Sequence, residues 1–304
     1  MDNIILAIHG GSGRIDPRPI PSEKEKRYKD KLEESLLSGY AILKAGGSSL
    51  DAVEAAINIL EDSGLFNAGK GAVYSFEDIN ELDASIMDGR TLKAGSIAGA
   101  KTIKNPISAA RSVMEKSSYV MLTGNGADQF ALDNNLTRVD PGYFKSSERW
   151  SQHLKSKKEQ LEPGKFGTVG AVALDNTGNL AAGTSTGGMM HKKYGRVGDS
   201  PIIGAGTYAN EHCAVSCTGH GEYFICSAAA HDICALTEYS GLTIQNAVEH
   251  VVHKKIASNG GKGGVIALDA KGNVGNTFST DGMFSGWITS DRKLTINVCN
   301  MIVE

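Results

Sequence analysis

Two segments of this chain share one strand–turn–strand pattern, and this pattern restricts the possible folds more than any other sequence feature. Residues 169–189, VGAVALDNTGNLAAGTSTGGM, and residues 263–283, GGVIALDAKGNVGNTFSTDGM, are identical at ten of 21 positions. In each copy an apolar run is followed by an Asp-x-x-Gly-Asn turn and then by a second run of strand-forming residues. The pattern predicts two β-hairpins, each with a turn glycine at positive φ.

Helical patterns occur in groups and do not alternate with every strand. Apolar spacing predicts helices at 24–46, at 49–62 behind the capping box Ser48-x-x-Asp51, from Asn105-Pro106 to about Lys116, near 221–239 and at 243–257. Short β-branched or alternating runs predict strands at 3–8, 83–87, 94–103, 168–174, 179–185, 213–218, 264–268, 273–280 and 293–302. This grouping favours an α+β fold over a doubly wound parallel sheet.

Composition excludes several classes of protein. The 304 residues suffice for one large domain, and 37 glycines imply many tight turns or close backbone contacts. A net charge of −3, with no basic stripe, gives no reason to expect nucleic acid or an anionic membrane as a partner. No apolar run approaches 18 residues, and the run at 4–8 is too short for a signal peptide. We therefore expect a cytoplasmic protein.

The cysteines argue against a disulfide framework or a zinc site. There are five, an odd number: Cys213, Cys217, Cys226, Cys234 and Cys299. Their spacing contains no C-x-x-C pair, and no histidine cluster completes a set of zinc ligands. Reduced thiols in the core are the expectation.

A charged segment precedes the first hairpin. Residues 145–165, KSSERWSQHLKSKKEQLEPGK, contain few apolar side chains and many charges, which predicts a surface linker or a disordered tail. The segment stops two residues before Gly167-Thr168, where the first hairpin begins.

The Gly167-Thr168 junction has the features that self-cleavage would need. The Thr168 hydroxyl could attack the Gly167 carbonyl, and hydrolysis of the resulting ester would free the threonine amine. A free α-amino group has a pKa of roughly 7.7–8, so the new terminus could accept the proton of its own hydroxyl. The alternative is that Thr168 is an ordinary strand residue.

Residues downstream of the junction could complete an active site. Thr184 and Thr186 follow the hairpin turn and would face Thr168 if the hairpin closes around Gly178-Asn179. Arg196 and Asp199 are spaced to bind a substrate with both a carboxylate and an ammonium, such as an amino acid, or to form a surface salt bridge. At a strand end, the backbone N–H groups at Thr218 and Gly219 could stabilise an oxyanion.

Seven segments together resemble the plant-type L-asparaginase / isoaspartyl aminopeptidase family of N-terminal nucleophile hydrolases. They are HGGSG (9–13), FNAGKG (66–71), LDASIMDG (82–89), GTVGAVALD (167–175), STGG (185–188), GRVGDSP (195–201) and TGHGE (218–222). The resemblance implies a four-layer αββα sandwich in a single domain, and a precursor that cuts itself into an α subunit (1–167) and a β subunit (168–304) assembled as (αβ)₂. It also implies hydrolysis of L-asparagine and β-aspartyl dipeptides.

The same resemblance assigns roles to individual residues. Thr168 matches the nucleophile, Thr186 its supporting hydroxyl, and Gly167-Thr168 the bond that is cut. Arg196 would hold the substrate carboxylate and Asp199 its ammonium, Thr218 and Gly219 match the oxyanion pair, and Gly221 closes that loop. Asn67 and the segment His9, Gly10 and Gly11 would lie beside the scissile bond, with His9 in a structural role and not as a base.

The resemblance implies no catalytic cofactor, but it does imply a structural sodium ion. Its ligands would be backbone carbonyls of Leu60, Glu61, Ser63, Phe66, Ala68 and Lys70, which side-chain patterns cannot reveal.

Other functions remain open from the sequence. Within the same clan, a glycosylasparaginase or a taspase-type threonine endopeptidase is possible. The expected absence of a signal peptide and of paired cysteines disfavours the first, and Asp199 disfavours the second. A catalytically silent binding module that never cleaves is a third possibility. A nucleotide-binding protein is disfavoured because no G-x-x-x-x-G-K-[ST] loop is present.

Overall fold

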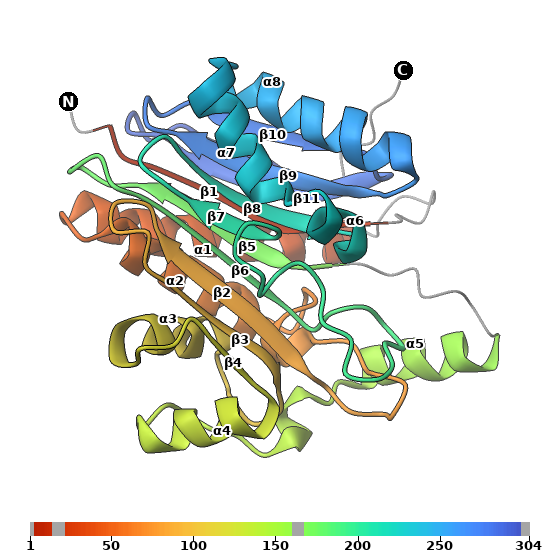
Figure 1. The fold of residues 1–304 in the computed structure, drawn as a ribbon. Coiled ribbons are helices and arrows are strands. Elements are labelled where there is room, and N and C mark those ends of the chain that lie inside the picture. The colour runs from red at the N-terminus through yellow and green to blue at the C-terminus, as the bar shows by residue number, and fades with distance from the viewer. Residues whose placement is uncertain (1–2, 14–21, 160–166, 299–304) are drawn as a thin grey trace.

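The computed structural model describes residues 3–13, 22–159 and 167–298 and contains two β-sheets (Figure 1). The larger sheet has eight strands in the order β12-β11-β1-β5-β6-β2-β3-β4, and the smaller has four in the order β10-β9-β8-β7. Every neighbouring pair is antiparallel except β3 and β4. The predicted α+β class is confirmed, and a doubly wound sheet is excluded.

The strands are β1 (Ile5–Gly13), β2 (Leu82–Asp88), β3 (Ala94–Ala100), β4 (Met121–Thr123), β5 (Val169–Leu174), β6 (Leu180–Thr186), β7 (Thr207–Ala209), β8 (Cys213–Gly219), β9 (Gly263–Asp269), β10 (Val274–Phe278), β11 (Gly282–Ile288) and β12 (Leu294–Asn297). The helices are α1 (Ser22–Lys44), α2 (Ser49–Asp62), α3 (Pro106–Lys116), α4 (Gly124–Asp133), α5 (Ser147–Lys158), α6 (Gly221–Cys226), α7 (Ala229–Ser240) and α8 (Ile244–Glu249). Short helical segments are η1 (Gly69–Gly71), η2 (Pro141–Phe144), η3 (His250–Ile256) and η4 (Ala257–Asn259).

Three apolar clusters hold these elements together. One lies between α1–α3 and the larger sheet, and another lies between the smaller sheet and α6–α8 with η3. The third lies between the two sheets, where Val172 of β5 and Ile266 of β9 are both fully buried. Figure 1 shows the sheets facing each other with helices on their outer sides. A strand between the sheets is buried on both faces, which explains the almost continuous apolar runs of β5 and β9.

Both predicted hairpins are present. β5 pairs with β6 and β9 with β10, each in antiparallel register. The turn glycines Gly178 and Gly272 have φ angles of 77° and 87°. In each turn an aspartate, Asp175 or Asp269, accepts hydrogen bonds from backbone N–H groups of the loop. Local turn chemistry is therefore enough to explain this repeat.

Several elements differ from the sequence prediction. The strands β4, β7 and β11 and the helix α4 were missed, and β1 continues to Gly13 through the HGGSG segment. The helix expected at 221–239 is two helices, because Ala228 adopts a left-handed conformation with a φ of 44°. Only the first part of the strand expected at 293–302 lies within the described residues. No helix of the described residues is both long and apolar enough to cross a membrane.

The charged segment before the first hairpin is largely helical, so the prediction of a linker or disordered tail was wrong for 147–158. Ser146 caps the N-terminus of helix α5, and its hydroxyl accepts from the Arg149 N–H. His153 is fully buried, and its ring lies 5.2 Å from the rings of both Tyr74 and Trp150. The helix is anchored by polar and aromatic side chains, which an apolar periodicity does not detect. Residues 160–166 lie outside the described residues.

The expectation of reduced thiols was wrong for one pair. Cys213 of β8 and Cys234 of α7 form a disulfide, with their Cα atoms 5.7 Å apart. The two residues are 21 positions apart in sequence, and only the packing of α7 on β8 brings them together. Cys217 and Cys226 are free, and Cys299 lies outside the described residues.

Candidate active site

The predicted nucleophile and its supporting hydroxyl meet at the end of the first hairpin. Because Val169 pairs with Ser185, Thr168 lies opposite Thr186. The Thr168 hydroxyl donates to the Thr186 Oγ1 over 3.2 Å, and the Thr186 hydroxyl donates to the Gly167 carbonyl over 3.0 Å. The Gly188 N–H donates to the same Thr186 oxygen at 2.9 Å. A continuous path therefore leads from the Thr168 hydroxyl to the carbonyl that it would attack.

Asn67 holds that carbonyl from the other side. Its Nδ2 donates to the Gly167 O at 2.8 Å and to the Gly188 O at 2.7 Å. Its Oδ1 accepts from the Val73 N–H at 2.9 Å, which assigns the amide orientation. All of its polar atoms are used, and the side chain is 4% exposed, so Asn67 is a rigid donor to the Gly167 carbonyl.

The HGGSG segment lies against the Gly167–Thr168 bond. His9 Nδ1 lies 3.0 Å from the Thr168 O and Nε2 lies 3.0 Å from the Ser216 Oγ. Complete burial lowers the pKa of His9 to about 3, so the imidazole is neutral. Gly11 has a φ of 103°, and a Cβ there would lie 2.9 Å from both the Gly167 Cα and the Thr168 N. Only glycine allows the backbone to approach the Gly167–Thr168 bond this closely.

A small cavity of about 10 Å³ adjoins Thr168. Its lining includes Thr186, Arg196, Asp199 and Gly219. A space of this size admits about one water molecule. The predicted residues therefore surround one point, but with Gly167 in place there is no room for an amino acid.

The two charged residues of the cavity are held differently. Arg196 makes a two-point ion pair with Glu222, with distances of 2.8 Å and 3.0 Å. Asp199 is 4% exposed, and its Oδ2 has no hydrogen-bond partner within the described part of the chain. Burial raises the pKa of Asp199 to about 7. An orphaned, buried carboxylate oxygen is suited to a ligand cation.

Gly221 separates these two charged groups. A Cβ at this position would lie 2.8 Å from the Arg196 Nη2 and 2.9 Å from the Asp199 Oδ1. The glycine thus keeps open the space in which a carboxylate and an ammonium could bind side by side. The ion pair of Arg196 with Glu222 was not predicted, although Glu222 stands in the TGHGE segment.

The predicted oxyanion residues lie at the end of β8. Gly219 lines the cavity and has a φ of 150°. Thr218 is fully buried beside it, and its hydroxyl accepts from the Ser12 N–H at 3.3 Å. Thr184, which was expected to face Thr168, instead contacts Ser216 and the Gly206 carbonyl. Of the two threonines after the turn, Thr186 is the one that contacts the Thr168 hydroxyl.

A buried charge cluster, not predicted from the sequence, lies beneath the site. Lys192 is 4% exposed, and its Nζ lies 3.9 Å from Asp83 and 3.7 Å from Glu81. A Cβ on Gly188, which lines the small cavity, would lie 3.0 Å from this Nζ. Asp83 is the strand neighbour of Thr186 across β2 and β6, and burial raises its pKa. The sequence signal for this cluster was Asp83 in LDASIMDG, because an aspartate at an inward-facing position of an apolar strand needs a buried partner.

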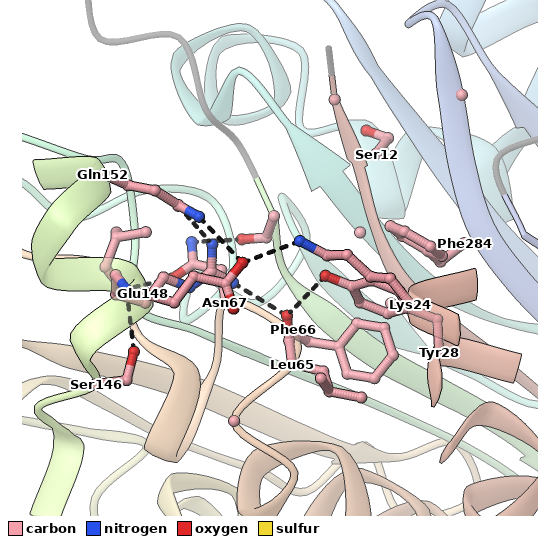
Figure 2. Close-up of a pocket in the computed structure, with 18 residues that line it drawn as sticks. Ser12, Lys24, Tyr28, Leu65, Phe66, Asn67, Ser146, Glu148, Gln152 and Phe284 are labelled. Atoms are coloured by element: carbon pink, nitrogen blue, oxygen red, sulfur yellow. Dashed lines mark hydrogen bonds and ion pairs between the residues drawn. The ribbon is translucent and has the colours of Figure 1, made fainter. Parts of the chain in front are cut away.

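A larger cavity of about 200 Å³ lies on the other side of Gly167 (Figure 2). Tyr28, Phe66 and Phe284 form an aromatic wall, with ring centroids 4.6–5.9 Å apart. On the opposite side, helix α5 contributes Glu148, which pairs with Lys24 at 2.9 Å. Gly167 and Asn67 line this cavity too, and Gly167 also lines the small one, so it lies between the two spaces.

The loop implied to bind sodium has the right donor type, since backbone carbonyls are hard oxygen ligands. Some of these carbonyls already accept hydrogen bonds: Leu60 from the Ser63 N–H, Phe66 from the Ala68 N–H and Ala68 from the Gly71 N–H. No cluster of His, Cys, Asp and Glu suited to a metal is found among the described residues. A sodium ion on the carbonyls of Leu60, Glu61, Ser63, Phe66, Ala68 and Lys70 stays a prediction.

Known proteins are similar in sequence to this chain over most of its length. The asparaginase family model matches residues 2–298. An isoaspartyl peptidase of Escherichia coli is 49% identical over 299 residues, which cover 94% of this chain and 93% of the relative. A plant-type L-asparaginase of Pyrococcus abyssi is 43% identical, with 92% and 94% covered, and an isoaspartyl peptidase/L-asparaginase of Mus musculus is 41% identical, with 89% and 83% covered.

These names denote hydrolases, and the match spans both sheets and every residue of the candidate site. The similarity is therefore not limited to one motif or one hairpin. The chain belongs to the asparaginase family.

Proposed function

We propose that this protein is an amidohydrolase that activates itself by cutting the Gly167–Thr168 bond. It then hydrolyses the side-chain amide of L-asparagine and the isopeptide bond of β-aspartyl dipeptides to release L-aspartate. The observation that carries the proposal is the pair of donors on the Gly167 carbonyl, Asn67 Nδ2 at 2.8 Å and Thr186 Oγ1 at 3.0 Å, beside the Thr168 hydroxyl.

The geometry supports the following order of chemical steps for self-cleavage. The Thr168 oxygen attacks the Gly167 carbonyl carbon while its proton passes to Thr186, and the Thr186 proton passes to the developing oxyanion. Collapse of this intermediate breaks the C–N bond, protonates the Thr168 amine and leaves an ester. Water then hydrolyses the ester to a Gly167 carboxylate and a free Thr168 hydroxyl. Donors already aimed at the carbonyl need no reorganisation when charge develops there.

In the second reaction the freed amine serves as the base. It accepts the Thr168 hydroxyl proton, and the oxygen attacks the substrate carbonyl next to Gly219 and Thr218. The leaving amine takes the proton, and water hydrolyses the aspartyl ester. Arg196 would bind the α-carboxylate and Asp199 the α-ammonium, which both substrates share. No cofactor takes part in these steps.

The proposal includes the architecture that goes with it. The layer order seen in Figure 1 supports an αββα sandwich of the N-terminal nucleophile hydrolase type. The single domain would become an α subunit of 1–167 and a β subunit of 168–304, assembled as (αβ)₂ in the cytoplasm.

Intact-mass measurement and a denaturing gel of purified protein test the cleavage. We expect two fragments, one ending at Gly167 and one beginning at Thr168, together with release of aspartate from asparagine and from a β-aspartyl dipeptide. Thr168→Ala should remain uncut and inactive. An unbroken wild-type chain that is inert toward both substrates would support the binding module, and turnover by Thr168→Ala would remove Thr168 from its role.

The Arg196→Ala variant distinguishes the proposed function from those of the glycosylasparaginase and taspase-type hydrolases. Loss of the guanidinium should raise KM for substrates with a free α-carboxylate and leave self-cleavage intact. Unchanged kcat/KM for asparagine would contradict the assignment. Preference for a glycosylated asparagine or for a protein loop would favour the glycosylasparaginase or taspase-type alternative.

A further inference from the structure

A continuous row of buried side-chain hydrogen bonds crosses the space between the two sheets and ends on the nucleophile. Five side chains form it, all fully buried: Ser85 of β2, Thr207 of β7, Thr184 of β6, Ser216 of β8 and His9 of β1. We call this set the hydroxyl chain. Strands from both sheets contribute, and Figure 1 shows how these strands come together between the helical layers.

The contacts of the hydroxyl chain are all short. The distances are 2.8 Å from Ser85 to Thr207, 2.5 Å from Thr207 to Thr184, 2.7 Å from Thr184 to Ser216, 3.0 Å from Ser216 to His9 Nε2 and 3.0 Å from His9 Nδ1 to the Thr168 O. These distances lie within the normal range for hydrogen bonds. The backbone carbonyls of Ser200 and Gly206 provide additional acceptors along the row.

The direction of the hydroxyl chain follows from counting protons. The Thr168 carbonyl can only accept, so His9 must carry its proton on Nδ1, and a neutral ring then leaves Nε2 as an acceptor. Ser216 must therefore donate to His9. Since each hydroxyl has one proton, Thr184 donates to Ser216 and Thr207 to Thr184. The single proton of Ser85 is shared between Thr207 and the Ser200 carbonyl, which lies 2.6 Å away. From Thr207 to His9, all the donors point toward the Thr168 carbonyl.

The surrounding backbone leaves room for this arrangement. Gly170 pairs with His9 across β1 and β5, and a Cβ there would clash with both the Ser216 Oγ and the His9 Nε2. The pKa of His9, which burial lowers to about 3, keeps the ring neutral at any pH at which the enzyme would work. Any side chain at 170 would break the contact between Ser216 and His9.

We propose that the hydroxyl chain is a positioning device that holds the nucleophile once it has become a chain end. The inference rests on the proposed function. Before cleavage Thr168 is held by peptide bonds on both sides, whereas afterwards the bond to Gly167 is gone and a new terminus tends to fray. The His9 hydrogen bond to the Thr168 carbonyl remains. Disrupting the hydroxyl chain should therefore impair hydrolysis by the mature enzyme more than self-cleavage.

Two substitutions of His9 test the end of the row. The amide nitrogen of Asn is separated from the backbone by the same number of bonds as Nδ1, and that of Gln by the same number as Nε2. His9→Asn should thus keep a donor to the Thr168 carbonyl, whereas His9→Gln should lose it. We expect kcat to remain higher in His9→Asn, with similar KM in both variants. Equal kcat, or the reverse order, would overturn the proposal.

Ser216→Ala tests the middle of the row, with Ser96→Ala as the matched control. Ser96 is equally buried, neighbours Ser85 across β2 and β3, and has no hydrogen-bond partner among the described residues. A displacement of about 1 Å can cost on the order of 100-fold in rate, so we expect Ser216→Ala to lower kcat by at least about 10-fold. KM and the rate of self-cleavage should change much less. Ser96→Ala should behave like the wild type.

A spectroscopic measurement keeps the test independent of activity and of folding defects. The ¹⁵N NMR shifts of His9 should show a proton on Nδ1 and an accepting Nε2, and Thr184→Val, which leaves the Ser216–His9 contact in place, should move the Nε2 signal. A proton on Nε2 in the wild type would overturn the proposal, as would a Ser216→Ala variant no slower than Ser96→Ala. A wild type that neither cuts nor hydrolyses would refute the proposed function instead.

Discussion

The chemistry of Asp199 depends strongly on its surroundings. It is buried next to Gly221, and one of its carboxylate oxygens lacks a partner among the described residues. Burial favours the neutral acid and raises the pKa to about 7. Binding of a substrate ammonium requires the ionised form, so burial and function oppose each other at this site.

We therefore expect kcat/KM for asparagine to rise with pH through about 7 as Asp199 ionises in the free enzyme. A free α-amino group such as that of Thr168 has a pKa of roughly 7.7–8, so it would titrate in the same pH range. The variant that separates the two effects is Asp199→Asn, which removes only the carboxyl group. In this variant kcat/KM should be much lower and the part of the rise near 7 should disappear. An identical pH profile in both proteins would contradict the assignment.

The same pKa affects folding. Because the folded-state value lies above the unfolded value of 3.8, ionisation opposes folding, and the free energy of unfolding should fall as pH rises from about 4 to about 7. Asp199→Asn should lose this part of the decline, which denaturant titrations at several pH values would measure.

At the scale of elements, helix α5 connects the tail of the proposed α subunit to the site. The Arg149 guanidinium is largely buried and donates to the Gly71 O at 3.0 Å and to the Leu65 O at 3.1 Å. These carbonyls flank Asn67, which donates to the Gly167 carbonyl. The helix thus holds the loop that carries one of the two donors invoked in the proposed self-cleavage.

Substitution of Arg149 should slow self-cleavage. A lysine ammonium lacks the planar fork that reaches two carbonyls, so Arg149→Lys should cut on the order of 10-fold more slowly, as followed by intact mass over time. Arg27→Lys, at an exposed position on α1, is the control and should cut at the wild-type rate. Equal rates for the two variants would mean that α5 does not position the loop.

Two glycines allow backbone strain to be measured without side-chain clashes. A Cβ at Gly178 or at Gly126 would meet nothing within 4 Å, but only Gly178 has a positive φ. Gly178→Ala should destabilise the protein by about 1–2 kcal/mol, whereas Gly126→Ala, inside α4, should stabilise it by about 0.8–1 kcal/mol. Thermal or chemical unfolding would show the opposite signs, and a shared sign would contradict the hairpin geometry.

For the whole molecule, the uncut chain closes its own site. The space beside Thr168 is about 10 Å³, enough for about one water, while the larger cavity lies beyond Gly167. Under the proposed function, an amino acid would bind there only after the Gly167 side has moved away. Activation would thus open the substrate site as well as create the nucleophile.

Calorimetric titration with L-aspartate, the expected product, tests this closure. The uncut Thr168→Ala variant should show no binding, and wild-type protein that has cleaved should bind. Thr168→Ser retains a hydroxyl and serves as the control, since it should cut and then bind. Tight binding of aspartate to the uncut Thr168→Ala chain would show that the site is open before cleavage.

Residues that interact through local geometry were predictable. Thr168 and Thr186 lie opposite each other because one turn joins their strands and side chains alternate along each strand. The confirmed hairpins have the expected turn glycines. Helix α5 was missed because its buried residue is His153, stacked on Trp150, and not a set of aliphatic residues at helical spacing. The Cys213–Cys234 disulfide was missed because spacing along the chain does not report the packing of a helix on a strand.

The sequence by itself determined the two hairpins, the α+β class and the short list of polar residues near the Gly167–Thr168 junction, because turn preferences and side-chain alternation act between near neighbours. Only the tertiary structure decided which of them meet: Arg196 with Glu222, His9 with Ser216, and Asn67 with the Gly167 carbonyl. Those pairs are separated by 26 to 207 positions. They come together because burying three apolar clusters fixes how the sheets and helices pack, and this packing sets which distant polar groups meet.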